Sequence, residues 1–446
     1  MNGKGAPSSR AAEEPRPGAV LEVVIERLGA SGDGEATLGE RRLFVPFTLP
    51  GERWRVRVEE AARSILRAAP LERLAGPARA EPVCPHFGSC GGCGLQHLPP
   101  ATYRDFVCAR IREALARERL SAEKELPLVS APLGSRRRLR LAFALGRREC
   151  LLGFRARRSH RIVSVARCPI ARPELVALFA PLREAFARLP VVRRVGAGEA
   201  ALALFAEGVD LVLAVAGDLA REDREALAEL ARALDLARVA HTRRIEEPAE
   251  PILVRRAPTL RYGRFAIAAP PGAFLQATED GERALQAAVR AWVPEGARLL
   301  DLFAGTGALS LPIADRLARL ELVERDTGTV AAVKRAVAQE GRIAVAARDL
   351  ERAPVGPEEL AAFDVVLLDP PRGGALAQCR ALARSRIARI VYASCAPASF
   401  ARDARVLADA GFRVATLQPI DQFLFAPAVE LVALLVRESL GGREAS

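Results

Sequence analysis

One stretch of this chain constrains its fold more than any other. It reads ARLLDLFAGTGALSLPIA: an apolar segment, 299–303, that runs into a glycine-rich turn and then into a helix-like pattern. In a sheet of parallel strands, the backbone amides of such a turn meet a nucleotide-like ligand at the carboxyl end of the strand. Glycine patterns of this kind also recur by chance, so the stretch predicts a ligand site only together with the segments that follow it.

Each of the next apolar segments also ends in a polar residue. These residues are, in chain order, Glu324 after 320–323, Asp369 after 364–368 and Cys395 after 389–394. An acidic side chain about twenty residues beyond the glycine turn is placed to accept hydrogen bonds from ribose hydroxyls. Because the carboxyl ends of parallel strands lie along one rim of a doubly wound sheet, we expect these groups to converge on one cleft.

Cys395 stands at a corner between an apolar strand and a helix-period run that begins near Pro397. The amide groups at the start of that helix point toward the thiol, which predicts a lowered pKa and a larger thiolate fraction. The alternative is a small buried apolar residue at a strand end. The convergence of polar groups on the same rim favours a reactive thiol.

Length and composition set the outer limits of the fold and of its partners. A chain of 446 residues with 50% hydrophobic residues predicts two or three domains with buried cores. Apolar runs long enough to span a membrane are missing, and the start lacks a signal-peptide core, so we expect a cytoplasmic protein with a disordered tail over residues 1–16. The formal charge of +12 predicts an acidic partner, most simply nucleic acid.

Residues 17–75 alternate apolar and polar positions in short segments that are separated by glycine turns. This spacing predicts a small β-barrel of the oligonucleotide-binding type. Such a barrel binds RNA in many proteins, and an inert structural barrel is the alternative.

Three cysteines follow closely within residues 76–110, in the segment CPHFGSCGGC, and predict a metal site in a compartment where disulfides are rare. They are Cys84, Cys90 and Cys93. Candidates for a fourth ligand are Cys108, Cys150 and Cys168, of which Cys168 is preferred because a proline follows it. Four thiolates suit either zinc or an iron–sulfur cluster, and the asymmetric spacing favours iron–sulfur.

Residues 111–262 predict a central α+β domain that binds RNA. Between Gly134 and Arg161 the chain carries ten arginines against one acid, Glu149. This imbalance predicts a phosphate-binding surface, with an ordinary solvated face as the alternative.

Taken together, these residues resemble the RNA uracil-5-methyltransferases, and most closely the bacterial 23S ribosomal RNA type that carries an iron–sulfur cluster. The resemblance covers nearly the whole chain and rests on CPHFGSCGGCGLQHL, GAFLQAT, DLFAGTG, DPPRGG, SCAP and PAVELVALL. It implies a multidomain α/β protein: an N-terminal TRAM β-barrel, a central α+β domain with a 4Fe-4S cluster, and a Rossmann-like class I methyltransferase domain over residues 263–446.

The resemblance also implies roles for individual residues. Cys395 would be the nucleophile and Glu430 the base, and the cluster would be held by Cys84, Cys90, Cys93 and Cys168. S-adenosyl-L-methionine would be bound by Gln276, Phe303, Gly305, Glu324, Asp349 and Asp369. The implied partner is RNA, with 23S ribosomal RNA favoured over transfer RNA, and neither a membrane nor an obligate protein partner is indicated.

Four positions depart from the family pattern. The chain has Ala396 and Ala308 where asparagine is usual, Ala428 in place of histidine, and Thr278 in place of asparagine. The departures leave the nucleophile and the base in place but bear on the RNA target. Two alternatives therefore stay open: a transfer RNA uracil-5-methyltransferase, and a catalytically degenerate RNA-binding factor for ribosome assembly. A cytosine-5-methyltransferase is disfavoured because a second cysteine is usual where this chain has DPPR.

Overall fold

The computed structural model describes residues 15–147 and 149–438, and these divide into two compact units. One unit holds the chain up to Pro82 together with Gly94–Tyr103, and the other holds Val83–Cys93 and the chain from Arg104 onward. Within the described ranges, no helix is both long enough and apolar enough to cross a bilayer. The tail predicted over residues 1–16 falls, up to residue 14, outside the described residues.

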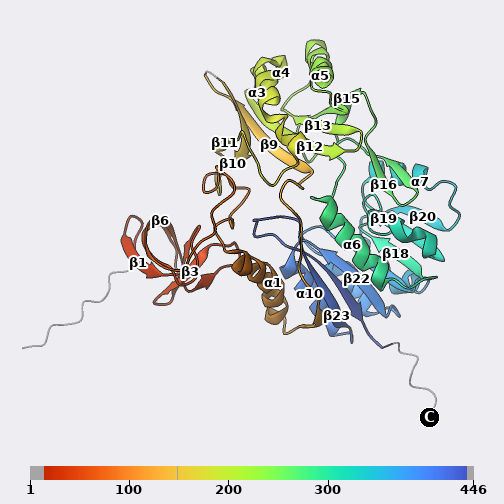
Figure 1. Cartoon of the computed structure of the whole chain (residues 1–446). Helices are drawn as coiled ribbons and strands as arrows, with labels where there is room; N and C mark the ends of the chain where they lie inside the picture. Colours follow the sequence, from red (N-terminus) through yellow and green to blue (C-terminus); the bar gives the residue numbers. More distant parts are fainter. Residues whose placement is uncertain (1–14, 148, 439–446) are drawn as a thin grey trace, which may run out of the picture. The chain divides into compact units, whose positions relative to one another are not determined.

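The first unit is built on an N-terminal sheet with the strand order β1-β5-β6-β4-β3-β2, coloured red in Figure 1. Its strands are β1 (Val20–Val24), β2 (Arg27–Leu28), β3 (Gly34–Leu38), β4 (Arg41–Val45), β5 (Arg53–Ala61) and β6 (Ile65–Ala75). Alternate residues on these strands are buried, and those of β1, β3, β4, β5 and β6 join one apolar cluster. Five of the six strands therefore share one core, in line with the alternating sequence pattern.

The central sheet has the strand order β11-β10-β9-β12-β13-β14-β15 and is antiparallel except between β13 and β14. Its strands are β9 (Arg138–Leu145), β10 (Cys150–Arg155), β11 (Ile162–Ser164), β12 (Ala197–Phe205), β13 (Gly208–Ala214), β14 (Arg238–Thr242) and β15 (Glu250–Val254). The helices that accompany it are α2 (Pro173–Val176), α3 (Phe179–Arg188), α4 (Pro190–Val195) and α5 (Arg221–Ala233). Phe143 on β9 packs against Phe186 on α3 with ring centroids 4.8 Å apart, so helix and sheet share one core.

The C-terminal sheet has the order β20-β19-β18-β21-β22-β24-β23-β7. Its strands are β18 (Arg298–Leu302), β19 (Arg319–Glu324), β20 (Ile343–Ala347), β21 (Val365–Leu368), β22 (Arg389–Ser394), β23 (Arg413–Asp421) and β24 (Glu430–Val436). The pairs from β20 to β22 are parallel, and β24 runs antiparallel to both of its neighbours. Successive strands lie on opposite sides of β18, so the strand order reverses there, where ligands bind in sheets of this type.

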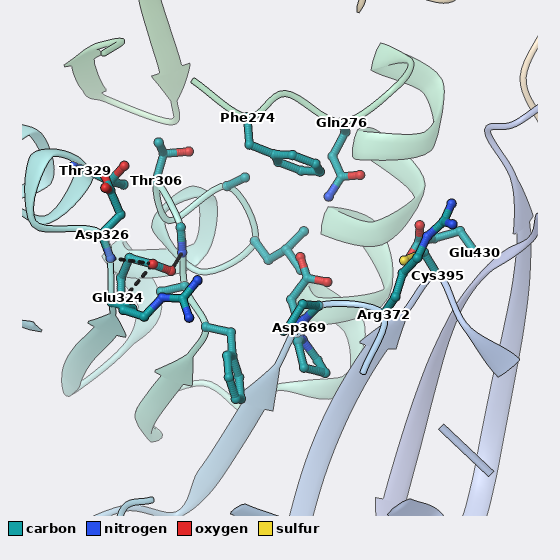
Figure 2. Close-up of a pocket in the computed structure, with 18 of the residues that line it drawn as sticks. Phe274, Gln276, Thr306, Glu324, Asp326, Thr329, Asp369, Arg372, Cys395 and Glu430 are labelled. Atoms are coloured by element: carbon teal, nitrogen blue, oxygen red, sulfur yellow. Dashed lines mark hydrogen bonds between the residues drawn. The ribbon is translucent and has the colours of Figure 1, made fainter. Parts of the chain in front are cut away.

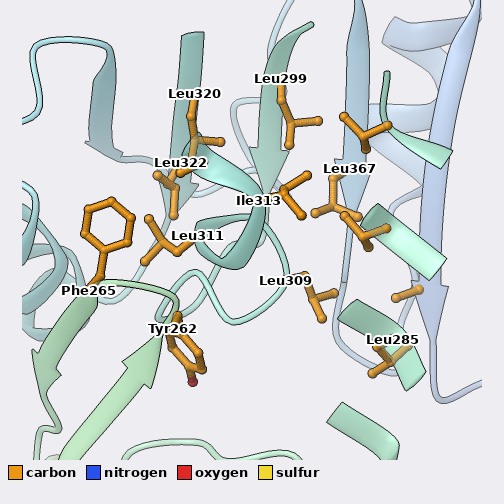
Figure 3. Packing of buried hydrophobic residues seen from close by; sticks show 14 of the residues in the cluster. Tyr262, Phe265, Leu285, Leu299, Leu309, Leu311, Ile313, Leu320, Leu322 and Leu367 are labelled. Atoms are coloured by element: carbon orange, nitrogen blue, oxygen red, sulfur yellow. The ribbon is translucent and has the colours of Figure 1, made fainter. Parts of the chain in front are cut away.

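Helices precede or connect the parallel strands of the C-terminal sheet. They are α6 (Glu279–Trp292), η1 (Leu311–Arg316), α7 (Thr327–Ala336), α8 (Pro357–Leu360), α9 (Leu376–Ala383) and α10 (Pro397–Ala408). Leu299, Leu320 and Leu367 on the strands pack with Leu285 of α6 in one cluster, as Figure 3 shows. These strands are mainly apolar because both faces of the sheet are covered.

Some segments join a sheet or core outside the domain range in which the sequence analysis placed them. The short strands β7 (Ala122–Glu125) and β8 (Val129–Ser130), from the range expected for the central domain, pair with β23 of the C-terminal sheet. The hairpin β16 (Thr259–Tyr262) and β17 (Phe265–Ala268) contributes to the same core as β18. The helix α1 (Pro100–Arg117) precedes β7. The domain boundaries at residues 110 and 262 stay predictions.

Candidate active site

A cavity of about 730 Å³ opens at the carboxyl rim of the C-terminal sheet. Its wall includes every residue that the sequence predicted for catalysis or for the methyl donor. These are Gln276, Phe303, Gly305, Glu324, Asp349, Asp369, Cys395 and Glu430. Figure 2 shows Glu324 at one end of the cavity, Cys395 with Glu430 at the other, and Asp369 between them. The predicted convergence of strand ends on one cleft is therefore confirmed, whereas the role of each residue stays a prediction.

Glu324, at the end of β19, is held by backbone amides. Its Oε2 accepts a hydrogen bond from the amide of Gly305 (3.0 Å), and its Oε1 accepts from Arg325 (2.7 Å) and Asp326 (2.8 Å). The turn before Gly305 places Phe303 at φ +60°, a left-handed conformation that costs free energy for a non-glycine residue and often marks a functional loop. The carboxylate is thus fixed at the mouth of the glycine turn, with oxygen lone pairs left for a ligand.

The next strand ends also place acidic groups on the wall. Asp349 follows β20, and its Oδ1 accepts from the amide of Glu351 at 3.1 Å. Asp369 follows β21, and burial raises the pKa of its carboxyl group. Asp301, on β18, is fully buried beneath the turn and accepts a hydrogen bond from Ser310 Oγ at 2.5 Å. Burial raises the pKa of Asp301 to about 8.

Cys395 and Glu430 form the other end of the cavity. Cys395 follows β22 and is half-buried, whereas Glu430 begins β24 and is 4% exposed. Burial, reinforced by the negative charge of Asp369, raises the pKa of Glu430 to about 8. A raised pKa is expected for a carboxyl group at the start of a buried apolar strand, because burial disfavours the charged form.

The prediction of a lowered thiol pKa is wrong. Burial raises the pKa of Cys395, and the nearby charge of Glu430 raises it further. Arg372, in the DPPR segment, opposes this shift because its guanidinium is a cation and hydrogen-bonds the sulfur. In Figure 2, Arg372 lies beside the sulfur of Cys395. The thiol is therefore half-buried, and the Arg372 cation is the group that favours its ionisation.

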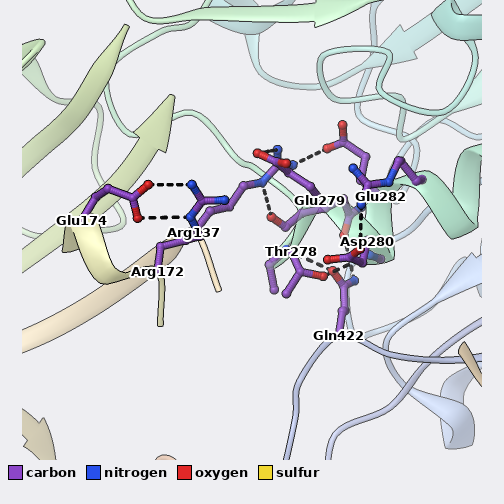
Figure 4. A network of polar contacts seen from close by, with 12 residues as sticks. Arg137, Arg172, Glu174, Thr278, Glu279, Asp280, Glu282 and Gln422 are labelled. Carbon is purple, nitrogen blue, oxygen red and sulfur yellow. Dashed lines mark hydrogen bonds and ion pairs between the residues drawn. The ribbon is translucent and has the colours of Figure 1, made fainter. Parts of the chain in front are cut away.

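The arginine run 136–138 does not form a simple solvated face. Arg137 is buried: its Nε donates to the carbonyl of Gln276 at 3.1 Å, and its guanidinium pairs with Glu282 on α6 (Figure 4). Arg136 and Arg138 both line the cavity. The interpretation of the whole run as a phosphate-binding surface is therefore wrong for Arg137, which instead fixes the loop before α6.

Arg138 and Phe274 form a pair at the cavity wall. The Arg138 guanidinium carbon lies 4.2 Å from the centroid of the Phe274 ring, within cation–π range. Phe274 is nevertheless 59% exposed, which is unusual for a large apolar side chain. An exposed ring beside a cation offers a surface on which an unpaired base can stack.

Hydrogen bonds connect Gln276 to Glu430, at the Cys395 end of the cavity, through Gln422, a buried residue between β23 and β24. Gln422 Nε2 donates to Gln276 Oε1 at 2.9 Å and to Glu430 Oε2 at 3.0 Å. Close by, Thr278 caps α6, since its Oγ1 accepts from the Gly281 amide at 3.0 Å. Threonine and asparagine both serve as N-caps, which gives this departure from the family pattern a structural equivalent.

Sequence reasoning missed three of these side chains. Arg372 lay in the DPPRGG motif without an assigned role, Arg138 was counted only among the ten arginines of residues 134–161, and Gln422 was not singled out. The one available hint for Gln422 was its place directly after an apolar strand, on the rim where other strand ends carry polar groups.

The predicted cluster cysteines lie near one another. The charges of Cys84 and Cys90 contribute to raising the pKa of Cys168, behind the larger effect of burial. The amides of Ala171 and Ile170 hydrogen-bond Cys168, and the amide of Gly92 donates to Cys90 Sγ at 3.4 Å. Such N–H groups are typical around iron–sulfur ligands. Within residues 15–147 and 149–438, however, no three Cys, His, Asp or Glu side chains are arranged to hold a metal ion.

The two other candidates for a fourth ligand have different neighbours. Burial raises the pKa of both thiols. The charged groups that also shift the pKa of Cys108 are Glu125, Arg112, Asp105 and Asp421, and those that shift the pKa of Cys150 are Arg183 and Glu149. These surroundings favour Cys168 as the companion of the CPHFGSCGGC cysteines. The four thiols therefore have the chemistry of iron–sulfur ligands, although their side chains are not arranged around a common metal position in the described residues.

Comparisons with known proteins agree with this architecture. A family model for the TRAM domain matches residues 15–71, and one described as "Conserved hypothetical protein 95" matches residues 281–388. The chain is 37% identical to an uncharacterized RNA methyltransferase of Brucella suis biovar 1, over 93% of this chain and 98% of that protein. It is 36% identical to the 23S rRNA (uracil(1939)-C(5))-methyltransferase RlmD of Chromohalobacter salexigens, over 95% of this chain and 90% of that protein.

Among solved structures, the fold is similar to that of the Pyrococcus abyssi tRNA (uracil-54, C5)-methyltransferase, which was determined in complex with S-adenosyl-L-homocysteine. The TM-score is 0.70 at 23% identity, over 93% of this chain and all of that one. This likeness bears on the fold alone. The relatives above 30% identity span nearly the whole chain, and they show that it belongs to the RNA uracil-5-methyltransferase family, whose enzymes depend on S-adenosylmethionine.

Proposed function

We propose that this enzyme transfers a methyl group from S-adenosylmethionine to carbon 5 of one uridine in 23S ribosomal RNA, through a covalent adduct between Cys395 and carbon 6. The observation that carries the proposal is the single cavity that joins a nucleoside-type rim at Glu324 to a thiol facing a buried carboxyl group at Glu430. The ribosomal target is favoured by the name of the Chromohalobacter relative.

The chemistry explains why a thiol is needed. Carbon 5 of uracil is too weak a nucleophile to take a methyl group unaided. Addition of the Cys395 thiolate to carbon 6 forms a sulfur–carbon bond and turns the ring into an enolate, which makes carbon 5 reactive. Arg372, a cation that hydrogen-bonds the sulfur, supplies the stabilisation that a buried thiolate requires.

Glu430 is the proposed base for the second half of the reaction. Once carbon 5 carries the methyl group, its proton must leave before the ring regains its double bond. The carboxylate of Glu430 takes this proton, the bond between sulfur and carbon 6 breaks, and the Cys395 thiolate is released. A carboxyl group with a pKa raised to about 8 is a stronger base than an exposed one, which suits removal of a carbon-bound proton.

The remaining wall residues are proposed to hold the methyl donor, which supplies the methyl group from its sulfonium. Glu324 would accept hydrogen bonds from the ribose hydroxyls beside the glycine turn of Phe303 and Gly305. Asp349 and Asp369 would contact the adenosine portion of the methyl donor and the target base beside it. Gln276 would contact the methionine end of the donor. In Figure 2, Glu324, Asp369 and Gln276 follow one another from the Glu324 end of the cavity toward its Cys395 end.

A uridine within folded RNA cannot reach Cys395 unless it is unpaired or flipped out. The exposed ring of Phe274 and the charge of Arg138 stand at the cavity wall, where they would stack on and neutralise an entering strand. The TRAM unit and the exposed arginines of the central sheet, such as Arg140 and Arg155, would bind the surrounding RNA.

We also propose a 4Fe-4S cluster with the ligands Cys84, Cys90, Cys93 and Cys168. Its support is the four-thiol donor set with N–H groups directed at Cys90 and Cys168. Bound there, the cluster would connect the loop of residues 84–93 to the segment before α2. We expect a structural role that positions RNA, because methyl transfer as described needs no electron transfer.

The test is to map 5-methyluridine in total RNA from strains with and without this gene, and to add the purified enzyme back to the RNA of the deletion strain. We expect one position of 23S ribosomal RNA to lose and then regain the modification. Loss from transfer RNA instead would establish the transfer RNA alternative. Unchanged 5-methyluridine in every RNA would leave the degenerate RNA-binding factor as the function.

A further inference from the structure

Gln422 is the feature of the cavity that the chemistry above does not use. It lies between β23 and β24 with 1% of its surface exposed, behind the cavity wall. Its Nε2 donates to Gln276 (2.9 Å) and to Glu430 (3.0 Å), and its Oε1 accepts from the Ala277 amide (3.0 Å). One side-chain amide therefore joins two wall residues that are far apart in the sequence.

The backbone determines which way this amide faces. The Ala277 N–H can only donate, so the Gln422 atom beside it must be the acceptor Oε1, and the other atom must be Nε2. Because Nε2 only donates, Gln276 must turn its own Oε1 toward Gln422. The Nε2 group of Gln276 is then left to face the cavity, as Figure 2 shows.

The packing around Gln422 is specific to it. A Cβ atom at Gly281, in the first turn of α6, would lie 2.7 Å from Gln422 Cβ and 2.9 Å from its Oε1. Real Cβ atoms do not approach other atoms so closely, so the helix accepts Gln422 only because residue 281 is glycine. The helix start is fixed in turn by the Thr278 cap and by the ion pair of Arg137 with Glu282.

We propose that Gln422 is a positioning residue that sets the polarity of two site groups at once. It holds Glu430 as a hydrogen-bond acceptor, and it turns Gln276 so that N–H groups face the cavity. This inference rests on the proposed roles of Glu430 as base and of Gln276 at the methionine end. An N–H donor there suits the carboxylate of the methyl donor and repels donor groups.

Substitutions of Gln422 separate polarity from packing. Gln422→Glu keeps the size of the side chain and still accepts from Ala277, but it has no N–H to give. Gln276 must then turn its Nε2 toward residue 422 and present Oε1 to the cavity, and Glu430 loses its donor. Gln422→Leu removes both donors without adding a charge. Gln378→Leu is the matched control, because Gln378 is fully buried, hydrogen-bonds the backbone of Val355, and does not line the cavity.

The first measurement is ligand binding by calorimetry, which needs no turnover. We expect Gln422→Glu to weaken the binding of S-adenosylhomocysteine at least about tenfold, because a charge-assisted hydrogen bond becomes a repulsion. The same substitution should leave the affinity for 5′-methylthioadenosine unchanged, because that ligand lacks the amino-acid carboxylate. Gln276→Leu should weaken S-adenosylhomocysteine in the same selective way.

The second measurement is the pH profile of turnover, which a merely structural role would not move. Gln422→Leu removes a donor that favours the ionised form of Glu430, so the pKa of Glu430 should rise. The limb of the profile on which activity increases with pH should therefore shift to higher pH by about one unit. Gln378→Leu should lower the Tm and leave the limb in place. Wild-type affinity and an unmoved limb in both Gln422 variants would overturn the inference. Failure of the proposed function would instead show in the wild-type enzyme, as an absence of 5-methyluridine.

Discussion

Glu430 gives a prediction about stability that needs neither RNA nor the methyl donor. Its carboxyl group has a pKa of about 8 in the folded protein, against an ordinary value of 4.5, first because it is buried and then because Asp369 lies nearby. An acid whose folded-state pKa is raised destabilises the protein as pH rises from the lower value to the higher one, since the unfolded chain ionises first. Glu430→Gln removes this effect with almost no change in shape.

The magnitude follows from the size of the shift. At about 1.4 kcal/mol per pKa unit, the difference between 4.5 and about 8 sets an upper bound of roughly 5 kcal/mol. Asp369 and Glu430 repel each other when both are ionised and therefore titrate as a pair, so replacing Glu430 alone recovers only part of this free energy. We expect a gain of about 2–3 kcal/mol above about pH 8, or about 4–12 °C in Tm.

The assay is thermal unfolding of the wild type and Glu430→Gln in steps from about pH 5 to about pH 9. The Tm difference should grow with pH and level off near pH 8, in favour of the variant. Glu174→Gln is the control: Arg172 lowers the pKa of Glu174, so the sign is reversed and no gain should develop. A Tm difference for Glu430→Gln that stays flat across this range would refute the buried, proton-binding carboxyl group.

Three further predictions concern the other parts of the site. Anaerobically purified protein should be brown, and alanine at a proposed cluster ligand such as Cys168 should bleach it, whereas alanine at Cys108 should not; stoichiometric zinc without iron would contradict the cluster. Glu324→Gln should weaken the binding of S-adenosylhomocysteine about tenfold or more and lower the Tm, because an NH2 group replaces one of the two oxygens that accept backbone amides; calorimetry and thermal unfolding would measure the two effects. Arg372→Gln should shift alkylation of Cys395 by iodoacetamide upward by about one pH unit, because the thiol loses its cation, and an unshifted profile would exclude this role.

The rim of the C-terminal sheet could be predicted from the sequence for a physical reason. In parallel strands joined by helices, the end of each apolar run reports the position of one rim residue. Glu324, Asp369 and Cys395 follow from this rule alone, and the cavity that contains all three agrees with it. The resemblance added Gln276 and Glu430, which lie on a loop and on an antiparallel strand, where the rule does not apply.

Features that depend on burial could not be predicted in the same way. The pKa of Cys395 is raised because desolvation and the charge of Glu430 outweigh the cation of Arg372, a balance that only the packed structure contains. Arg137 and Arg138 are neighbours in the sequence, yet one pairs with Glu282 and the other lies against Phe274 in the cavity wall. The pairing of β7 with β23 joins residues about 290 positions apart, and no local pattern encodes it.

The covalent step between Cys395 and carbon 6 is the central claim, and RNA carrying 5-fluorouridine at the target tests it most directly. Fluorine cannot leave as a proton, so the wild-type enzyme should methylate this RNA and stay attached to it on a denaturing gel. Glu430→Gln should accumulate the same complex even on unmodified RNA, because it forms the adduct but releases it slowly. Cys395→Ala should form no complex and show no turnover. Full methylation activity in Cys395→Ala would contradict the mechanism.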